Sequence, residues 1–240
     1  MARKRITEED LLAFRAQADE IHQELEVKFE KMERAKKTQE ELEERDIGLL
    51  ILRGADVDMA AMRKFGNAAW NNGYSYEVVD LSESPVDHNP KERIPAWQRA
   101  LDKAQLGYLK LGERAKHIIV IGTGVTAAAA TVITEQYPVD ALVIVGEGPA
   151  TKTFAKDRVT ARMASIAKNN LFSIVCPVYI IAPEITGDYK PGSSSMFEES
   201  SRSDDVRVEH ISGMSAAQIW TEREQDMEKR IFGFLREFSD

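Results

Sequence analysis

The feature that most restricts the fold is a repeated alternation of short apolar runs with longer amphipathic stretches, beginning at residue 47. The apolar runs are IGLLILRG (47–54), YSYEVVDL (74–81), HIIVIG (117–122), DALVIVG (140–146) and CPVYIIA (176–182), and VRVEHIS (206–212) is expected as a last short strand. The amphipathic stretches are 59–73, 94–113, 125–137, 157–170 and 221–238. Strands that are apolar on both sides need both sheet faces covered, and intervening helices make such strands parallel. The alternation therefore predicts an α/β protein, a three-layer sandwich with a mostly parallel sheet.

The first 45 residues differ in composition from the rest, because they contain no Gly or Pro and are rich in Glu, Lys, Arg, Gln and Ala. They predict one long N-terminal helix of roughly 60 Å. Its apolar side chains follow the three-four spacing of a coiled-coil seam, with Leu11, Phe14, Ile21, Leu25 and Met32 as its main positions. We expect a helical arm, 1–45, that docks on another copy or on a different protein, and an α/β domain, 46–240. A helix that instead packs along its own domain remains an alternative, since surface helices also carry apolar stripes.

Composition excludes some partners and suggests a compartment. The net charge of −8 and the pI near 5.2 argue against nucleic acid or an anionic membrane as the main partner. No run of apolar residues is long enough for a spanning helix, and the N-terminus has no signal-peptide pattern. The single cysteine, Cys176, lies in an apolar run where burial is expected. These features predict a cytoplasmic protein.

A glycine-rich turn follows the run at 117–122 and permits two interpretations. In the first, Gly122, Gly124 and Ala127 satisfy the G-x-G-x-x-A pattern of dinucleotide-binding folds between a strand and a helix. Glu147, at the end of the next expected strand, is then available for a ribose hydroxyl. This interpretation predicts an oxidoreductase or a sensor that binds NAD or FAD.

In the second interpretation, the same turn is a nucleophile elbow, G-x-S-x-G, which lifts its central side chain above the sheet. The five elbow positions are then Gly122, Thr123, Gly124, Val125 and Thr126. Gly124 occupies the nucleophile position and cannot attack a substrate. The neighbouring threonines are poor substitutes, since an elbow directs only its central side chain to the substrate.

The order of expected strands and helices from Ile47 onward resembles the α/β-hydrolase fold from its third strand to its end. In this resemblance Arg53 stands in the His place of the His-Gly oxyanion motif, with Gly54 matching, and Asp80 ends the next strand. The resemblance implies Glu184 or Asp188 as the nearest candidates for the catalytic acid.

The family's catalytic histidine is expected just after a glycine, yet Gly213 is followed by Met214, and His210 lies earlier, within the expected strand. We expect His210 to be a partly buried, hydrogen-bonded strand residue. The resemblance thus implies a degenerate member without the Ser nucleophile and catalytic His.

No metal site and no cofactor are expected. His22, His88 and His117 are isolated, so no pair has metal-ligand spacing. Asp56 and Asp58 follow the first strand and would ligate an ion only together with Glu147, whereas capping of the next helix is the commoner use of such carboxylates.

Together these observations predict a non-catalytic, structural or scaffolding subunit that acts through its N-terminal helix. Two alternatives remain open: the dinucleotide-binding oxidoreductase or sensor, and a residual hydrolase with a non-standard catalytic set.

Overall fold

A computed structural model describes most of the domain that follows the N-terminal segment. The described residues are 45–55, 57–82, 96–146, 166–167, 169, 171–184, 201–212, 218–220 and 224–238. Several predicted features lie outside them, namely residues 1–44 with the whole expected seam, Asp56, His88, Glu147, Asp188, Gly213 and Met214.

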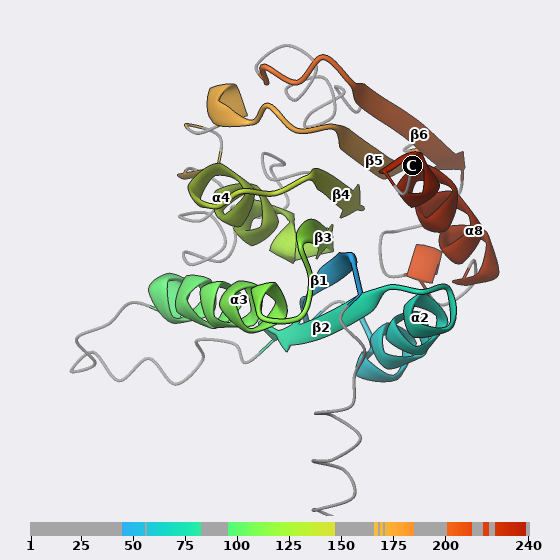
Figure 1. Ribbon diagram of the computed structural model, residues 1–240. Coiled ribbons are helices and arrows are strands. Elements are labelled where there is room, and N and C mark those ends of the chain that lie inside the picture. Colours follow the sequence, from blue (N-terminus) through green and yellow to red (C-terminus); the bar gives the residue numbers. More distant parts are fainter. Residues whose placement is uncertain are drawn as a thin grey trace, which may run out of the picture. The chain divides into compact units, whose positions relative to one another are not determined.

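The domain is built on one sheet of six strands (Figure 1). The strands are β1 (Ile47–Arg53), β2 (Ser75–Asp80), β3 (His117–Thr123), β4 (Ala141–Val145), β5 (Val178–Glu184) and β6 (Val206–Ser212). Their order is β2-β1-β3-β4-β5-β6, and every neighbouring pair is parallel. This confirms the parallel α/β sheet that the sequence predicts, and the carboxyl ends of all six strands share one edge of the sheet.

Helices cover both faces of the sheet (Figure 1). On one face lie α2 (Met59–Asn71) and α8 (Glu224–Leu235), and on the other lie α3 (Ala96–Gly112) and α4 (Ala127–Gln136). The central strand β4 is buried along its whole length. This double cover is the physical reason for its unbroken apolar sequence.

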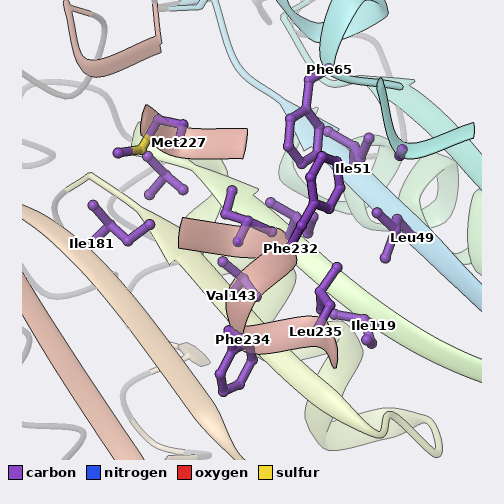
Figure 2. Packing of buried hydrophobic residues seen from close by; sticks show 14 of the residues in the cluster. Leu49, Ile51, Phe65, Ile119, Val143, Ile181, Met227, Phe232, Phe234 and Leu235 are labelled. Carbon is purple, nitrogen blue, oxygen red and sulfur yellow. The ribbon is translucent and has the colours of Figure 1, made fainter. Parts of the chain in front are cut away.

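The core on the α2 and α8 face is rich in aromatic side chains (Figure 2). Phe65 of α2 is fully buried and contacts Trp220 edge-to-face at 5.2 Å between ring centroids. It also stacks on Phe232 of α8 at 5.4 Å, and Phe232 stacks in turn on Tyr74. This chain of rings joins both helices on this face to each other.

Two local predictions are confirmed. Asp58 caps α2, because its carboxylate accepts a hydrogen bond from the Ala60 N–H at 3.2 Å. Cys176 is buried, and burial raises the pKa of its thiol to about 11. A thiol with this pKa stays protonated and unreactive near neutral pH.

Candidate functional site

The turn between β3 and α4 lies at the carboxyl edge of the sheet, where open α/β sheets bind their ligands. A short 3-10 turn, Gly124–Thr126, joins the two elements. Gly124 has a φ of +49°, in the left-handed region that costs side-chain-bearing residues on the order of 1 kcal/mol or more. The chain therefore makes a sharp strand-to-helix turn with a glycine at its bend.

Gly122 allows α4 to lie directly against β3. A Cβ added to Gly122 would stand 2.7 Å from the Ala130 Cβ and 2.9 Å from the Ala127 Cα. Such distances are too short for carbon atoms, so only glycine fits. Two of the three residues in the predicted dinucleotide pattern, Gly122 and Ala127, are thus explained by packing of the helix on the strand.

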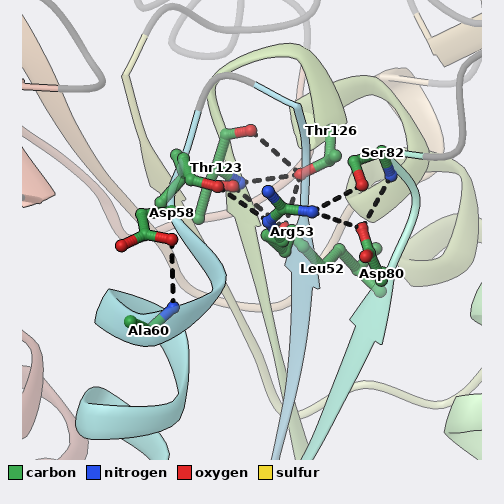
Figure 3. Close-up of polar contacts among 9 residues, drawn as sticks. Leu52, Arg53, Asp58, Ala60, Asp80, Ser82, Thr123 and Thr126 are labelled. Carbon is green, nitrogen blue, oxygen red and sulfur yellow. Dashed lines mark hydrogen bonds and ion pairs between the residues drawn. The ribbon is translucent and has the colours of Figure 1, made fainter.

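Two threonines fasten this turn to the neighbouring strand β1 (Figure 3). The Thr126 hydroxyl donates to the Leu52 carbonyl at 2.6 Å and accepts from the Thr123 N–H at 2.9 Å. The Thr123 hydroxyl donates to the same Leu52 carbonyl at 3.0 Å. The two threonines are 0% and 2% exposed. Both hydroxyls are therefore committed to holding the turn and are shielded from solvent.

Removing one of these hydroxyls gives a test of the turn's stability. Thr126→Val keeps the shape of the side chain but leaves the buried Thr123 N–H without its acceptor. We therefore expect the free energy of unfolding to fall by about 1–3 kcal/mol. Urea denaturation measures this. Thr131→Val is the matched control, because the Thr131 hydroxyl bonds to the Ala127 carbonyl of its own helix, and it should cost about 1 kcal/mol or less.

Arg53, at the end of β1, organises a second polar group at the same edge (Figure 3). Its Nε donates to the Val57 carbonyl at 2.7 Å, and its Nη1 forms an ion pair with Asp80 at 2.7 Å and a hydrogen bond with Ser82. The Arg53 side chain is only 14% exposed. Sequence reasoning noticed Arg53 and Asp80 separately but did not pair them, and it missed Ser82. The Asp-x-Ser spacing is the available signal, since the Ser82 N–H donates to the Asp80 carboxylate as in an Asx turn.

The Asp80 carboxylate titrates below its usual range. Partial burial acts to raise its pKa, but hydrogen bonds from Ser82 and Arg53, together with the Arg53 charge, outweigh burial and lower the pKa. A lowered pKa in the folded state contributes stability above the unfolded pKa of about 3.9, and this contribution is lost as the pH falls through the folded pKa.

We therefore expect Asp80→Asn to make the free energy of unfolding less dependent on pH below about 4. Near neutral pH the loss should stay below about 1 kcal/mol, because the Asp80 side chain is 38% exposed. Urea midpoints measured at pH 7 and near pH 3 for both proteins check this. An Asn variant with an unchanged pH profile would contradict the assigned role of the carboxylate.

The other residues of the hydrolase resemblance are not gathered at the turn. His210 lies in β6 beside Ala182 of β5, and Glu184 ends β5 beside Ser212. The expectation that His210 is partly buried is wrong: its side chain is exposed, because β6 is the last strand of the sheet. His117 does have a carboxylate partner, Asp140, at 3.0 Å, but this pair lies at the amino ends of β3 and β4, the edge opposite the turn.

Among the described residues, no three His, Cys, Asp or Glu side chains come close enough together to hold a metal ion. None of the helices there has the length and apolarity needed to cross a membrane.

Solved structures show what this arrangement resembles. One solved chain, described with LipS and LipT, two metagenome-derived lipolytic enzymes, matches at a TM-score of 0.66 and 13% identity, over 81% of this chain and 95% of that chain. MenH from S. aureus matches at a TM-score of 0.60 and 13% identity, over 83% of this chain and 97% of that chain. An esterase from Pyrococcus furiosus matches at a TM-score of 0.55 and 17% identity, over 80% of this chain and 83% of that chain. The chain has the α/β-hydrolase fold.

At these identities the comparison shows the fold alone. No protein-family model and no curated protein sequence matches the chain. Catalytically active members of the α/β-hydrolase fold carry their nucleophile on the sharp strand-to-helix turn. In this chain the β3–α4 connection is a sharp strand-to-helix turn, and Gly124 stands at its bend.

Proposed function

We infer that this protein is a non-catalytic α/β-hydrolase-fold protein that serves as a structural or scaffolding subunit. The observation that supports this most directly is Gly124, with its φ of +49°, at the bend between β3 and α4. Acyl transfer by this fold needs a side-chain oxygen at that bend, a histidine base within hydrogen-bond reach and an orienting acid. Glycine provides no oxygen at all.

The neighbouring hydroxyls do not replace the missing one. Thr123 and Thr126 are buried, and each donates to the Leu52 carbonyl, so neither is free to attack a substrate without dismantling the turn. His210 lies within β6 with an exposed side chain. Backbone donors in the turn would still bind an oxyanion, but without a nucleophile they form no covalent intermediate.

A panel of short acyl esters tests the absence of catalysis. We expect the purified full-length chain to hydrolyse p-nitrophenyl acetate, butyrate and octanoate no faster than buffer. We also expect Gly124→Ser to stay inactive, because a serine alone lacks a base to activate it. Turnover by the native chain above the buffer rate would overturn the proposal in favour of the residual hydrolase.

The scaffolding part of the proposal rests on the sequence of residues 1–45. The seam Leu11, Phe14, Ile21, Leu25 and Met32 would bury its apolar side chains against a helix of another chain. Burial of such side chains in a protein contact is worth a few kcal/mol for each large one. The arm would then bind either a second copy or a different protein.

Full-length seam variants test the arm without truncating it. Ile21→Lys with Leu25→Lys should lower the mass measured by light scattering or release a co-purifying protein. The matched control is Gln17→Lys with Gln23→Lys, which adds the same two positive charges at polar residues of the segment that lie off the seam. A seam variant that behaves like the control would show that the arm makes no such contact.

A further inference from the structure

The strand β6 ends the sheet, and its outer edge has no neighbouring strand among the described residues. An open edge presents unpaired N–H and C=O groups and is a template for another strand. Proteins commonly block such edges with proline, with charged side chains, especially lysine, or with a bulge. Val206–Ser212 contains neither proline nor lysine and pairs with β5 in an unbroken register, and its two charged residues, Arg207 and Glu209, are of opposite sign.

Strand geometry identifies which groups of β6 face outward. The Val178 N–H of β5 donates to the Asp205 carbonyl at 2.8 Å, so Asp205 directs its backbone groups toward β5. Backbone direction alternates along a parallel strand, and Arg207 and Glu209 therefore also face β5. Val206, Val208 and His210 direct their N–H and C=O groups to the open edge.

The most economical occupant of such an edge is a second copy related by a two-fold axis. An axis perpendicular to the sheet makes the two β6 strands antiparallel and joins two sheets into one. Residues that lie directly opposite each other in an antiparallel pair have their side chains on the same face of the sheet. The two-fold axis must therefore pass beside one residue of β6 and not between two residues. The choice of that residue sets every cross-strand pair.

Charge complementarity selects Val208 as this centre. With Val208 opposite Val208, Arg207 lies opposite Glu209 of the other copy, and Glu209 lies opposite Arg207. Centring on Arg207 or on Glu209 would instead place like charges directly opposite each other, which is unfavourable. Only the Val208 register among these three gives two opposite-charge pairs.

The side chains involved are available at the surface. Arg207 and Glu209 are 41% and 43% exposed and line a pocket of about 420 Å³ between β6 and α8. Within the chain, Arg207 bonds Asp205 and Glu237, and Glu209 pairs with Arg230. A carboxylate has about four acceptor sites, so cross-strand pairs extend this network rather than replace it.

We propose that β6 pairs antiparallel with β6 of a second copy, centred on Val208, to form one continuous sheet across a two-fold dimer. Val208 exchanges backbone hydrogen bonds with its counterpart, and Val206 does so with His210. His210, which is exposed in the single chain, then lies opposite Val206 of the second copy. This proposal is independent of the absence of catalysis and of the arm.

A site-directed disulfide tests the register in the full-length chain. In this dimer the two Val208 Cα atoms lie about 5.5 Å apart, within the range that a disulfide spans. The two His210 Cα atoms lie about 14 Å apart, beyond that range. Val208→Cys should form a disulfide-linked dimer on mild oxidation at least about ten times more efficiently than His210→Cys. Equal or negligible cross-linking of both variants would overturn the proposal.

A proline substitution tests the backbone pairing separately. The Val208 N–H faces away from β5, so Val208→Pro removes an outward donor at a kind of position where edge strands tolerate proline. We expect the variant to keep its circular dichroism spectrum and to show a lower dimer fraction at the same concentration by sedimentation. A mass that falls with Ile21→Lys and Leu25→Lys but stays unchanged with Val208→Pro would assign self-association to the arm and contradict this proposal.

Discussion

Phe65→Ala is expected to lower the free energy of unfolding by about 3–5 kcal/mol, the range for an aromatic side chain deleted from a packed core. Phe65 is 0% exposed and contacts both Trp220 and Phe232. The deletion would leave a cavity where α2, α8 and the residues around Trp220 meet, and this rigid set of rings has little freedom to collapse into it. Urea denaturation followed by far-UV circular dichroism measures the change.

The matched control is Phe172→Ala. Phe172 lies in the short helical turn Leu171–Ser173 and is 57% exposed, so its loss should change the free energy of unfolding by less than about 1 kcal/mol. Because both variants delete the same kind of side chain, the difference between their free energies of unfolding measures the effect of burial. A Phe65→Ala variant as stable as Phe172→Ala would mean that the ring cluster is not the core of this face.

Gly122→Val is expected to destabilise the protein by about 3 kcal/mol or more, at the upper end of the range for overpacking a core. Even a single Cβ at Gly122 would stand 2.9 Å from the Ala127 Cα, and a backbone atom does not move aside as a flexible side chain does. Relief would require α4 to move away from β3, which would also break the Thr126 bond to Leu52. Gly122→Ala should show a smaller loss of about 1–3 kcal/mol.

Gly112→Ala serves as the control for the glycine series. A Cβ added there would meet only the Ile118 Cδ1, at an ordinary contact distance of 3.7 Å. We therefore expect a change within about 1 kcal/mol, measured in the same denaturation experiment. If Gly122→Ala were equally harmless, the close packing of α4 on β3 would be wrong, and the glycines of the turn would need another explanation.

Much of the fold could be predicted because the hydrophobic pattern of a strand indicates directly whether one or both faces of its sheet are buried. The run at 141–145 is apolar at each position, and such a strand is stable only between two layers of helices. The strand-to-helix turn at Gly124 was also predictable, since glycine next to a strand indicates a special backbone conformation.

Contacts between residues far apart in sequence were not predictable from local pattern. The Leu52 carbonyl lies 71 and 74 residues before the two threonines that bond to it, and nothing in the apolar run marks it as an acceptor. The exposure of His210 depends on which strand ends the sheet, and the strand order is a property of the whole topology. Arg53 and Asp80 meet only because β1 and β2 are neighbours in a particular register.

We propose that the bend at Gly124 carries no nucleophile and that no other residue of the chain replaces it. Covalent labelling tests this most directly: the purified full-length protein is incubated with a fluorophosphonate probe, and its intact mass is measured. We predict an unchanged mass, with a serine esterase labelled fully in a parallel reaction. Stoichiometric addition of one probe molecule, located by peptide mapping on a serine or threonine of this chain, would contradict the account.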